Sequence, residues 1–132
     1  MTTTATKIES FLRLSLNNKH IFVSDANTKH EGEYKYAVFF NERNYKDYTS
    51  NKMDSEDLII WQLDGGNFGF SYIVEDPGVY MYKDGSGMPP SCELVEYKET
   101  FVNILDCIKK ISEFIFQNLV NEAVINYNEN YD

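Results

Sequence analysis

Cysteine, histidine, proline and long apolar runs are all scarce in this sequence of 132 residues. Its two cysteines, Cys92 and Cys107, are too few for a disulfide framework, which favours a reduced protein in the cytoplasm. No apolar run approaches the roughly 18 residues of a membrane span. The N-terminal stretch "MTTTATKIESFLRLSLNN" is equally short of apolar residues, so we expect neither a signal peptide nor a membrane anchor.

Basic residues are also few, because 12 Lys and Arg face 21 Asp and Glu for a net charge of −9. Residues 1–52 hold eight basic and six acidic groups, whereas residues 53–132 hold four basic and fifteen acidic groups. This balance argues against direct binding to nucleic acid or to an anionic membrane, both of which need clustered positive charge. A surface that attracts a basic partner is the alternative to a purely solubilising role.

The first half of the chain alternates helical and strand patterns. Thr6 and Glu9 fit a capping box, and the apolar residues that follow predict a helix over residues 6–17. Short β-branched and aromatic runs predict strands at Ile21 to Asp25 and at Tyr34 to Phe40. The polar segment 41–57 has no clear period, so we expect a long loop that contains at most a short helix.

The stretch "WQLDGGNFGF" carries glycines that suggest either a phosphate loop or a turn. Strand patterns flank it on both sides, over Ile59 to Leu63 and over residues 68–74. A phosphate loop needs a helix after the glycines, and the Gly-Lys-Ser/Thr of a Walker motif is absent. Asp64 to Asn67 therefore predicts the turn of a β-hairpin.

The second half continues as a meander and ends in a helix. Residues 79–83 and 92–97 predict further strands, separated by turns that contain Pro89 and Pro90. A helix is predicted over residues 99–124 from the apolar stripe Phe101, Ile104, Leu105, Ile108, Ile111, Ile115 and Leu119. These elements predict a single α+β domain over residues 1–125 and a frayed polar tail over residues 126–132. An antiparallel meander sheet would pack against the long C-terminal helix and the shorter N-terminal helix.

No catalytic or metal motif passes a test of spacing. The start of a calcium loop at Asp25 fails because Lys29, His30 and Tyr36 replace its ligand, glycine and glutamate. Glu33 and Lys35 match a bare nuclease skeleton, but a nuclease also needs a basic groove. His20 and His30 stand alone, and Ser71 lacks the glycines of a nucleophile elbow. We therefore expect neither an enzyme nor a bound metal or other cofactor.

Acidic and aromatic residues gather on the predicted meander, where they can form a face for protein binding. Aromatic side chains supply anchors at interfaces, and charge supplies steering and choice of partner. Trp61 and Tyr72 are expected to face the core. The candidate partner-binding residues are Asp54, Glu56, Asp57, Asp64, Glu75, Asp76, Tyr80, Tyr82, Asp84, Glu93 and Glu96.

In size, acidity, helix–meander–helix order and the "DGGN" turn before an aromatic strand, the chain resembles small bacterial immunity proteins, among them the SMI1/KNR4-like superfamily. The resemblance implies an inhibitor that blocks a basic partner such as a toxin nuclease. We expect the protein to act as a monomer or homodimer. Two alternatives stay open: a phage-type anti-defence inhibitor that mimics nucleic acid, and a small-molecule-binding α+β module with a pocket lined by Phe and Tyr. A scaffolding subunit that pairs through an edge strand is a further reading.

Overall fold

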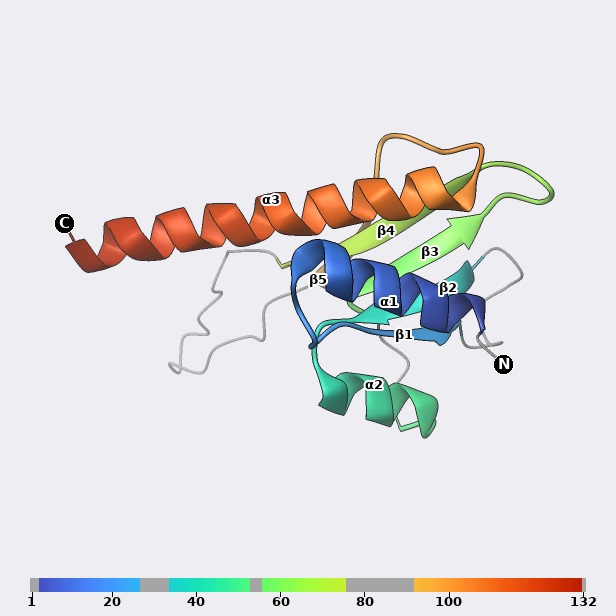
Figure 1. Ribbon diagram of the computed structural model, residues 1–132, viewed down its shortest axis with the longest axis horizontal. Helices are drawn as coiled ribbons and strands as arrows, with labels where there is room; N and C mark the ends of the chain where they lie inside the picture. Colours follow the sequence, from blue (N-terminus) through green and yellow to red (C-terminus); the bar gives the residue numbers. More distant parts are fainter. Residues whose placement is uncertain (1–2, 27–33, 53–55, 76–91, 132) are drawn as a thin grey trace, which may run out of the picture.

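In the described part of the chain, five antiparallel strands form one sheet in which spatial order follows chain order (Figure 1). The computed structural model describes residues 3–26, 34–52, 56–75 and 92–131. Each strand pairs with the next one along the chain, so that Ser71 lies opposite both Ile59 and Glu96. The strands are β1 (Phe22–Asp25), β2 (Tyr34–Phe39), β3 (Leu58–Gln62), β4 (Phe68–Glu75) and β5 (Cys92–Glu96).

The N-terminal helix α1 (Thr4–Leu16) and the C-terminal helix α3 (Ile104–Tyr131) cover the same face of this sheet. Buried Ile8 and Leu12 of α1 meet Ile111 of α3 and Phe70 of β4 in the main core. The alternation of Phe68, Phe70 and Tyr72 toward that core is the pattern expected of a strand with one buried face. The predicted α+β class, with a meander sheet and two packing helices, is confirmed.

Helix α1 begins earlier than predicted. Thr3 is the N-cap, and its hydroxyl accepts a hydrogen bond of 3.1 Å from the Thr6 N–H. The capping box at Thr6 was therefore wrong, because a hydroxyl of the same kind is available three residues upstream. Glu9 is freed from a capping role and instead accepts a hydrogen bond of 3.1 Å from the Val23 N–H on β1.

Helix α3 differs from the predicted helix over 99–124 at both ends. Two backbone hydrogen bonds of 2.7 Å to Phe68 hold Phe101 in an extended conformation. The helix therefore begins at Ile104, where the Asn103 side chain caps it by accepting a hydrogen bond from the Asp106 N–H. It continues through residues 126–131, which the sequence predicts as a frayed tail, because residues 104–131 contain no Gly or Pro to stop it. At 28 residues it spans about 42 Å, and Figure 1 shows it projecting past the sheet.

The opposite face of β1 and β2 has a second, smaller core. Helix α2 (Glu42–Thr49) occupies part of the polar segment that was expected to hold at most a short helix. Its N-cap Asn41 accepts a hydrogen bond of 2.7 Å from the Asn44 N–H. Buried Tyr48 packs against Phe39, with ring centroids 5.0 Å apart. Aromatic packing therefore fixes a helix whose other side chains are mainly polar.

The predicted hairpin turn between β3 and β4 is confirmed. The Gly66 N–H donates to the Leu63 carbonyl at 2.7 Å, and Gly65 has a φ of +62°, which glycine adopts without a steric penalty. A strand follows the glycines, so their backbone N–H groups are not the start of a helix. The strand predicted at 79–83 and the turns around it lie outside the described residues.

Candidate partner-binding surface

Two loops meet at the end of the sheet where α3 begins (Figure 1). One is the β3–β4 turn over residues 63–67, and the other joins β5 to α3 over residues 97–103. The paired backbone hydrogen bonds between Phe68 and Phe101 hold the loops together. The Asn67 side-chain amide also donates to the Thr100 hydroxyl at 3.1 Å. These contacts fix the relative position of two surface loops that are distant in sequence.

These loops and the first turn of α3 expose apolar and acidic side chains together. Three aliphatic side chains are unusually exposed, with Val102 at 82%, Leu105 at 49% and Leu63 at 45%. Exposed Asp64, Glu99 and Asp106 accompany them. We call the resulting set the hairpin end, and it consists of Leu63, Asp64, Glu99, Val102, Leu105 and Asp106. The loop over residues 97–103 also exposes Lys98, so acidic groups outnumber basic ones here without excluding them. Apolar groups that a monomer leaves in water beside charged groups are typical of an interaction surface.

Asp64 is the predicted binding residue that falls on the hairpin end. Glu56 and Asp57 lie at the other end of β3, whose five residues span about 17 Å. The Asp57 carboxylate accepts a hydrogen bond of 2.9 Å from the Phe40 N–H, and the Asp57 N–H donates to the Val38 carbonyl at 3.2 Å. Asp57 is therefore occupied in joining β2 to β3, and it does not share a surface with Asp64.

The predicted residues on β4 and β5 are spread along those strands. Glu75 and Glu93 lie at the end of the sheet opposite the hairpin end, where Glu75 pairs with Cys92 and Glu93 with Val74. Glu96 is exposed near the other end of β5. The predicted binding residues Asp54, Asp76, Tyr80, Tyr82 and Asp84 lie outside the described residues.

The aromatic side chains of β3 and β4 belong to the interior, as the sequence indicates for Trp61 and Tyr72. Trp61 is buried, and its indole N–H donates to the buried Ser71 hydroxyl at 3.2 Å. Tyr72 is half-buried and packs on Phe114, with ring centroids 4.5 Å apart. In the described residues, the exposed large apolar side chains of the hairpin end are therefore aliphatic rather than aromatic.

The sequence reading missed Val102 and placed Leu105 in the core stripe. A usable signal was present, because Ile104, Ile108 and Ile111 already form one helical face. Leu105 follows Ile104 by one residue and so lies on the flank of that face. An apolar face limited to residues three or four apart, such as Ile104, Ile108 and Ile111, would have placed Leu105 on the surface.

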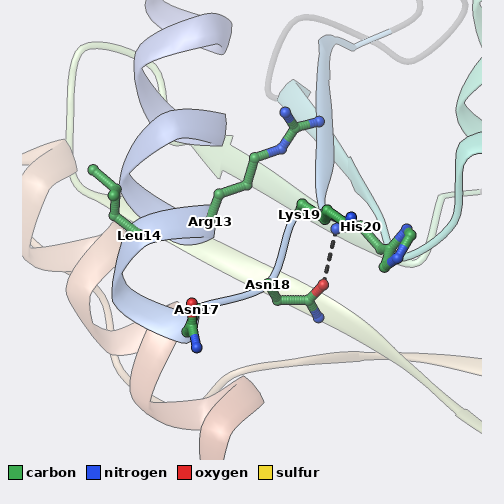
Figure 2. A pocket seen from close by; sticks show the side chains of 6 residues that line it. All are labelled: Arg13, Leu14, Asn17, Asn18, Lys19 and His20. Atoms are coloured by element: carbon green, nitrogen blue, oxygen red, sulfur yellow. Dashed lines mark hydrogen bonds between the residues drawn. The ribbon is translucent and has the colours of Figure 1, made fainter.

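A surface concavity of about 470 Å³ lies at the C-terminal end of α1 (Figure 2). The Arg13 guanidinium beside it is already engaged, because Nε donates to the Ile21 carbonyl at 2.7 Å and the group lies 4.9 Å from the Phe22 ring centroid. Figure 2 shows Leu14 and Asn17 pointing away from Arg13. A ligand pocket needs polar groups that converge, so this concavity does not favour a small-molecule function. It is lined by Arg13, Leu14, Asn17, Asn18, Lys19 and His20.

Cys107, the buried cysteine of α3, is not an activated nucleophile. Burial raises the pKa of the Cys107 thiol to about 12, so the thiolate is scarce near neutral pH. No group of three or more metal-binding side chains comes together among the described residues. In that same part of the chain, no helix has both the length and the apolar character of a transmembrane segment.

No protein-family model, curated protein or solved structure matches this chain. The resemblance to small acidic immunity proteins therefore stays a prediction from sequence. The function is inferred below from the chemistry of the protein surface.

Proposed function

We propose that this protein is a small acidic inhibitor, of the immunity or antitoxin type, that binds a basic protein partner and blocks it. The observation that carries the proposal is the hairpin end, where exposed aliphatic side chains stand beside exposed carboxylates on two loops joined by hydrogen bonds. A toxin nuclease is a fitting partner, because its phosphate-binding groove must be basic.

The two kinds of side chain have separate tasks in such a complex. The net charge of −9 and the carboxylates of the hairpin end attract a basic partner over a range set by ionic strength. Leu63, Val102 and Leu105 lose their contact with water on binding, which stabilises the complex once it has formed. Loops that are already fixed by hydrogen bonds lose less conformational entropy on binding than free loops do.

The proposal includes action in the cytoplasm, without a cofactor and without catalysis, as a monomer or homodimer. An inhibitor of this kind works by occupying a surface, so it needs complementary charge and shape but no reactive group. The high pKa of the Cys107 thiol is consistent with that role.

A comparison of two variants with the same net charge tests the proposal. Asp64→Asn with Glu99→Gln removes two charges from the hairpin end, while Asp25→Asn with Glu42→Gln removes two exposed charges from β1 and α2. Each tagged protein would capture partners from a lysate of the source organism, followed by elution in steps of salt and mass spectrometry. Purified partner and variants would then give dissociation constants by calorimetry.

We expect a basic partner that is released at high salt. The hairpin-end variant should bind it about tenfold or more weakly, whereas the control pair should change affinity by less than about threefold, as rim charges do. Equal effects of the two variant pairs would show that net charge alone matters and would refute the assignment of the surface. A partner that is neutral or acidic would refute the proposed class.

A further inference from the structure

The edge strands β1 and β5 differ in whether other described residues bond to their outward backbone groups. On β1, the outward Val23 N–H is bonded by the Glu9 carboxylate of α1. The neighbouring outward carbonyl of Ile21 accepts from Arg13 of the same helix, and Arg13 lies 3.6 Å from Glu9. Side chains of α1 therefore occupy these two outward backbone groups, which hinders the addition of another strand there.

No described strand pairs with the outer side of β5, which forms the other edge. The Tyr97 N–H donates to the Phe70 carbonyl at 2.9 Å, and hydrogen-bonded pairs alternate along an antiparallel ladder. Val95 therefore bonds toward β4, while the N–H and C=O groups of Leu94 and Glu96 point outward. The Leu94 side chain is 50% exposed and Glu96 is exposed as well, so this edge is accessible to solvent.

We propose that the outer edge of β5 is a docking site for an extended segment of the basic partner, which pairs with β5 as an additional antiparallel or parallel strand. This inference rests on the proposed function, since it takes the partner to be basic. Leu94 and Glu96 lie on the same face of the sheet, two residues apart. They select a segment with an apolar residue opposite Leu94 and a Lys or Arg opposite Glu96, because opposite charges across a strand pair are stabilising.

The charge of β5 argues against a second copy of this chain as the occupant. Its sequence, Cys-Glu-Leu-Val-Glu, holds two glutamates and no basic residue. Pairing two β5 edges would gather four glutamates from two chains that each carry a net charge of −9. Like charges brought together in this way destabilise a strand pair, whereas a basic segment neutralises them.

The other face of β5 also suits an incoming strand. Val95 and Tyr97 are half-buried there, and Tyr97 stacks on Phe70 with ring centroids 4.5 Å apart. Alternate residues of the segment would therefore extend the main core, while the residues between them would meet Leu94 and Glu96. Beyond Tyr97 the chain leads directly to Glu99 of the hairpin end, so one extended segment can contact both surfaces.

Amide hydrogen exchange measured by NMR tests the site with a defined probe. The probe is a peptide of the repeat Lys-Thr-Val-Thr, which places lysine and valine two residues apart on one face, and its controls are the same peptide with N-methylated backbone amides and an uncharged peptide with serine in place of lysine. We expect the lysine peptide to slow exchange of the Leu94 and Glu96 amides by about tenfold or more, without effect on Val23. The N-methylated peptide should give no protection, and added salt should weaken the effect.

Two variants separate the backbone from the charge. Glu96→Pro removes an outward N–H while leaving the bonds to β4 intact, and proline is tolerated at such a position of an edge strand. It should abolish protection of Leu94. Glu96→Gln keeps the backbone and should weaken peptide binding by about twofold to fivefold, as expected for an exposed ion pair. Urea denaturation of both variants confirms that they remain folded.

The remaining outcomes all overturn the inference, and they are distinguishable. Protection of the two amides in the free protein that rises with its own concentration identifies a second copy as the occupant. Equal protection by the uncharged peptide removes the requirement for a basic segment. Spectral changes confined to the hairpin end leave the proposed function intact but place the partner elsewhere. No protection by the lysine peptide at millimolar concentration shows that the edge does not accept a strand. The proposed function itself fails separately, in the lysate comparison.

Discussion

Replacement of Gly69 by alanine should force the only tryptophan of this protein out of its site. Gly69 lies opposite Trp61 in the pairing of β3 and β4, and the indole ring covers it. A Cβ atom at Gly69 would stand 2.2 Å from Cζ2 of that ring, well inside van der Waals contact. Strand positions opposite a large ring often need glycine for this reason.

The expected loss of stability can be worked out from three effects. Displacement of a buried ring by an added methyl group costs about 1–3 kcal/mol. Separation of the Trp61 indole N–H from the buried Ser71 hydroxyl adds about 1–3 kcal/mol. Removal of a glycine from a strand returns about 0.5–1 kcal/mol. Together these effects amount to about 1–5 kcal/mol, and we expect Gly69→Ala to lower the free energy of unfolding by about 3 kcal/mol, near the middle of that range.

Urea denaturation followed by circular dichroism and by Trp61 fluorescence measures this loss. The denaturation midpoint should fall by about 1–2 M, and the native emission should shift to the red as the indole meets water. In a Trp61→Leu background the same Gly69→Ala change should cost less than about 1 kcal/mol, because the clash is gone. An equal cost in both backgrounds, or a single variant with unchanged midpoint and emission, would refute the reasoning.

Three further predictions concern an edge, a thiol and a turn. Glu9→Gln should lower the free energy of unfolding by about 1–2 kcal/mol in urea and speed hydrogen exchange of the Val23 amide, because a charged acceptor is lost; unchanged exchange would contradict this. Because burial raises the pKa of Cys107 from 9.0 to about 12, its contribution to stability should be complete below pH 9 and fall between pH 9 and 12; a Cys107→Ala variant with the same pH profile would disprove it. Gly65→Ala should cost about 1 kcal/mol because φ is +62°, whereas Gly66→Ala, whose nearest contact is 3.6 Å away, should cost less than about 0.5 kcal/mol; equal costs would refute the conformational argument.

Strands and the core helix face could be predicted from periodicity, because burial of one face requires it. A strand or helix that buries one face needs apolar residues at the period of that element. Phe68, Phe70 and Tyr72 alternate along β4 for this reason, and Ile108 and Ile111 are spaced by three residues along α3. The start of α1 could not be predicted, since Thr3 and Thr6 are equivalent as local capping residues. The use of Thr3 as the N-cap goes with a contact between residues distant in sequence, in which the Glu9 carboxylate accepts a hydrogen bond from the Val23 N–H of β1.

The site was less accessible to sequence reasoning than the fold. Charge counting indicated that the acidic groups lie in the second part of the chain, but it does not say which of them are used internally. Asp57 and Asp64 look alike in sequence, yet the Asp57 carboxylate holds a backbone N–H of β2 while Asp64 is exposed on a turn. Exposure of Val102 depends on the bridge between Phe68 and Phe101, a pairing between distant residues that no local pattern reveals.

The β1 and β5 edges of the sheet are protected from unwanted strand pairing in different ways. An open edge is a risk for any β protein, and α1 reduces that risk at β1 with a carboxylate and a guanidinium. Glutamates on β5 reduce it differently, because they repel another β5 while leaving the backbone groups of Leu94 and Glu96 free to bond. The glutamates that repel a second copy of β5 would attract a segment that carries Lys or Arg. In the proposed complex, the same charges that keep two copies apart select a basic partner for this edge.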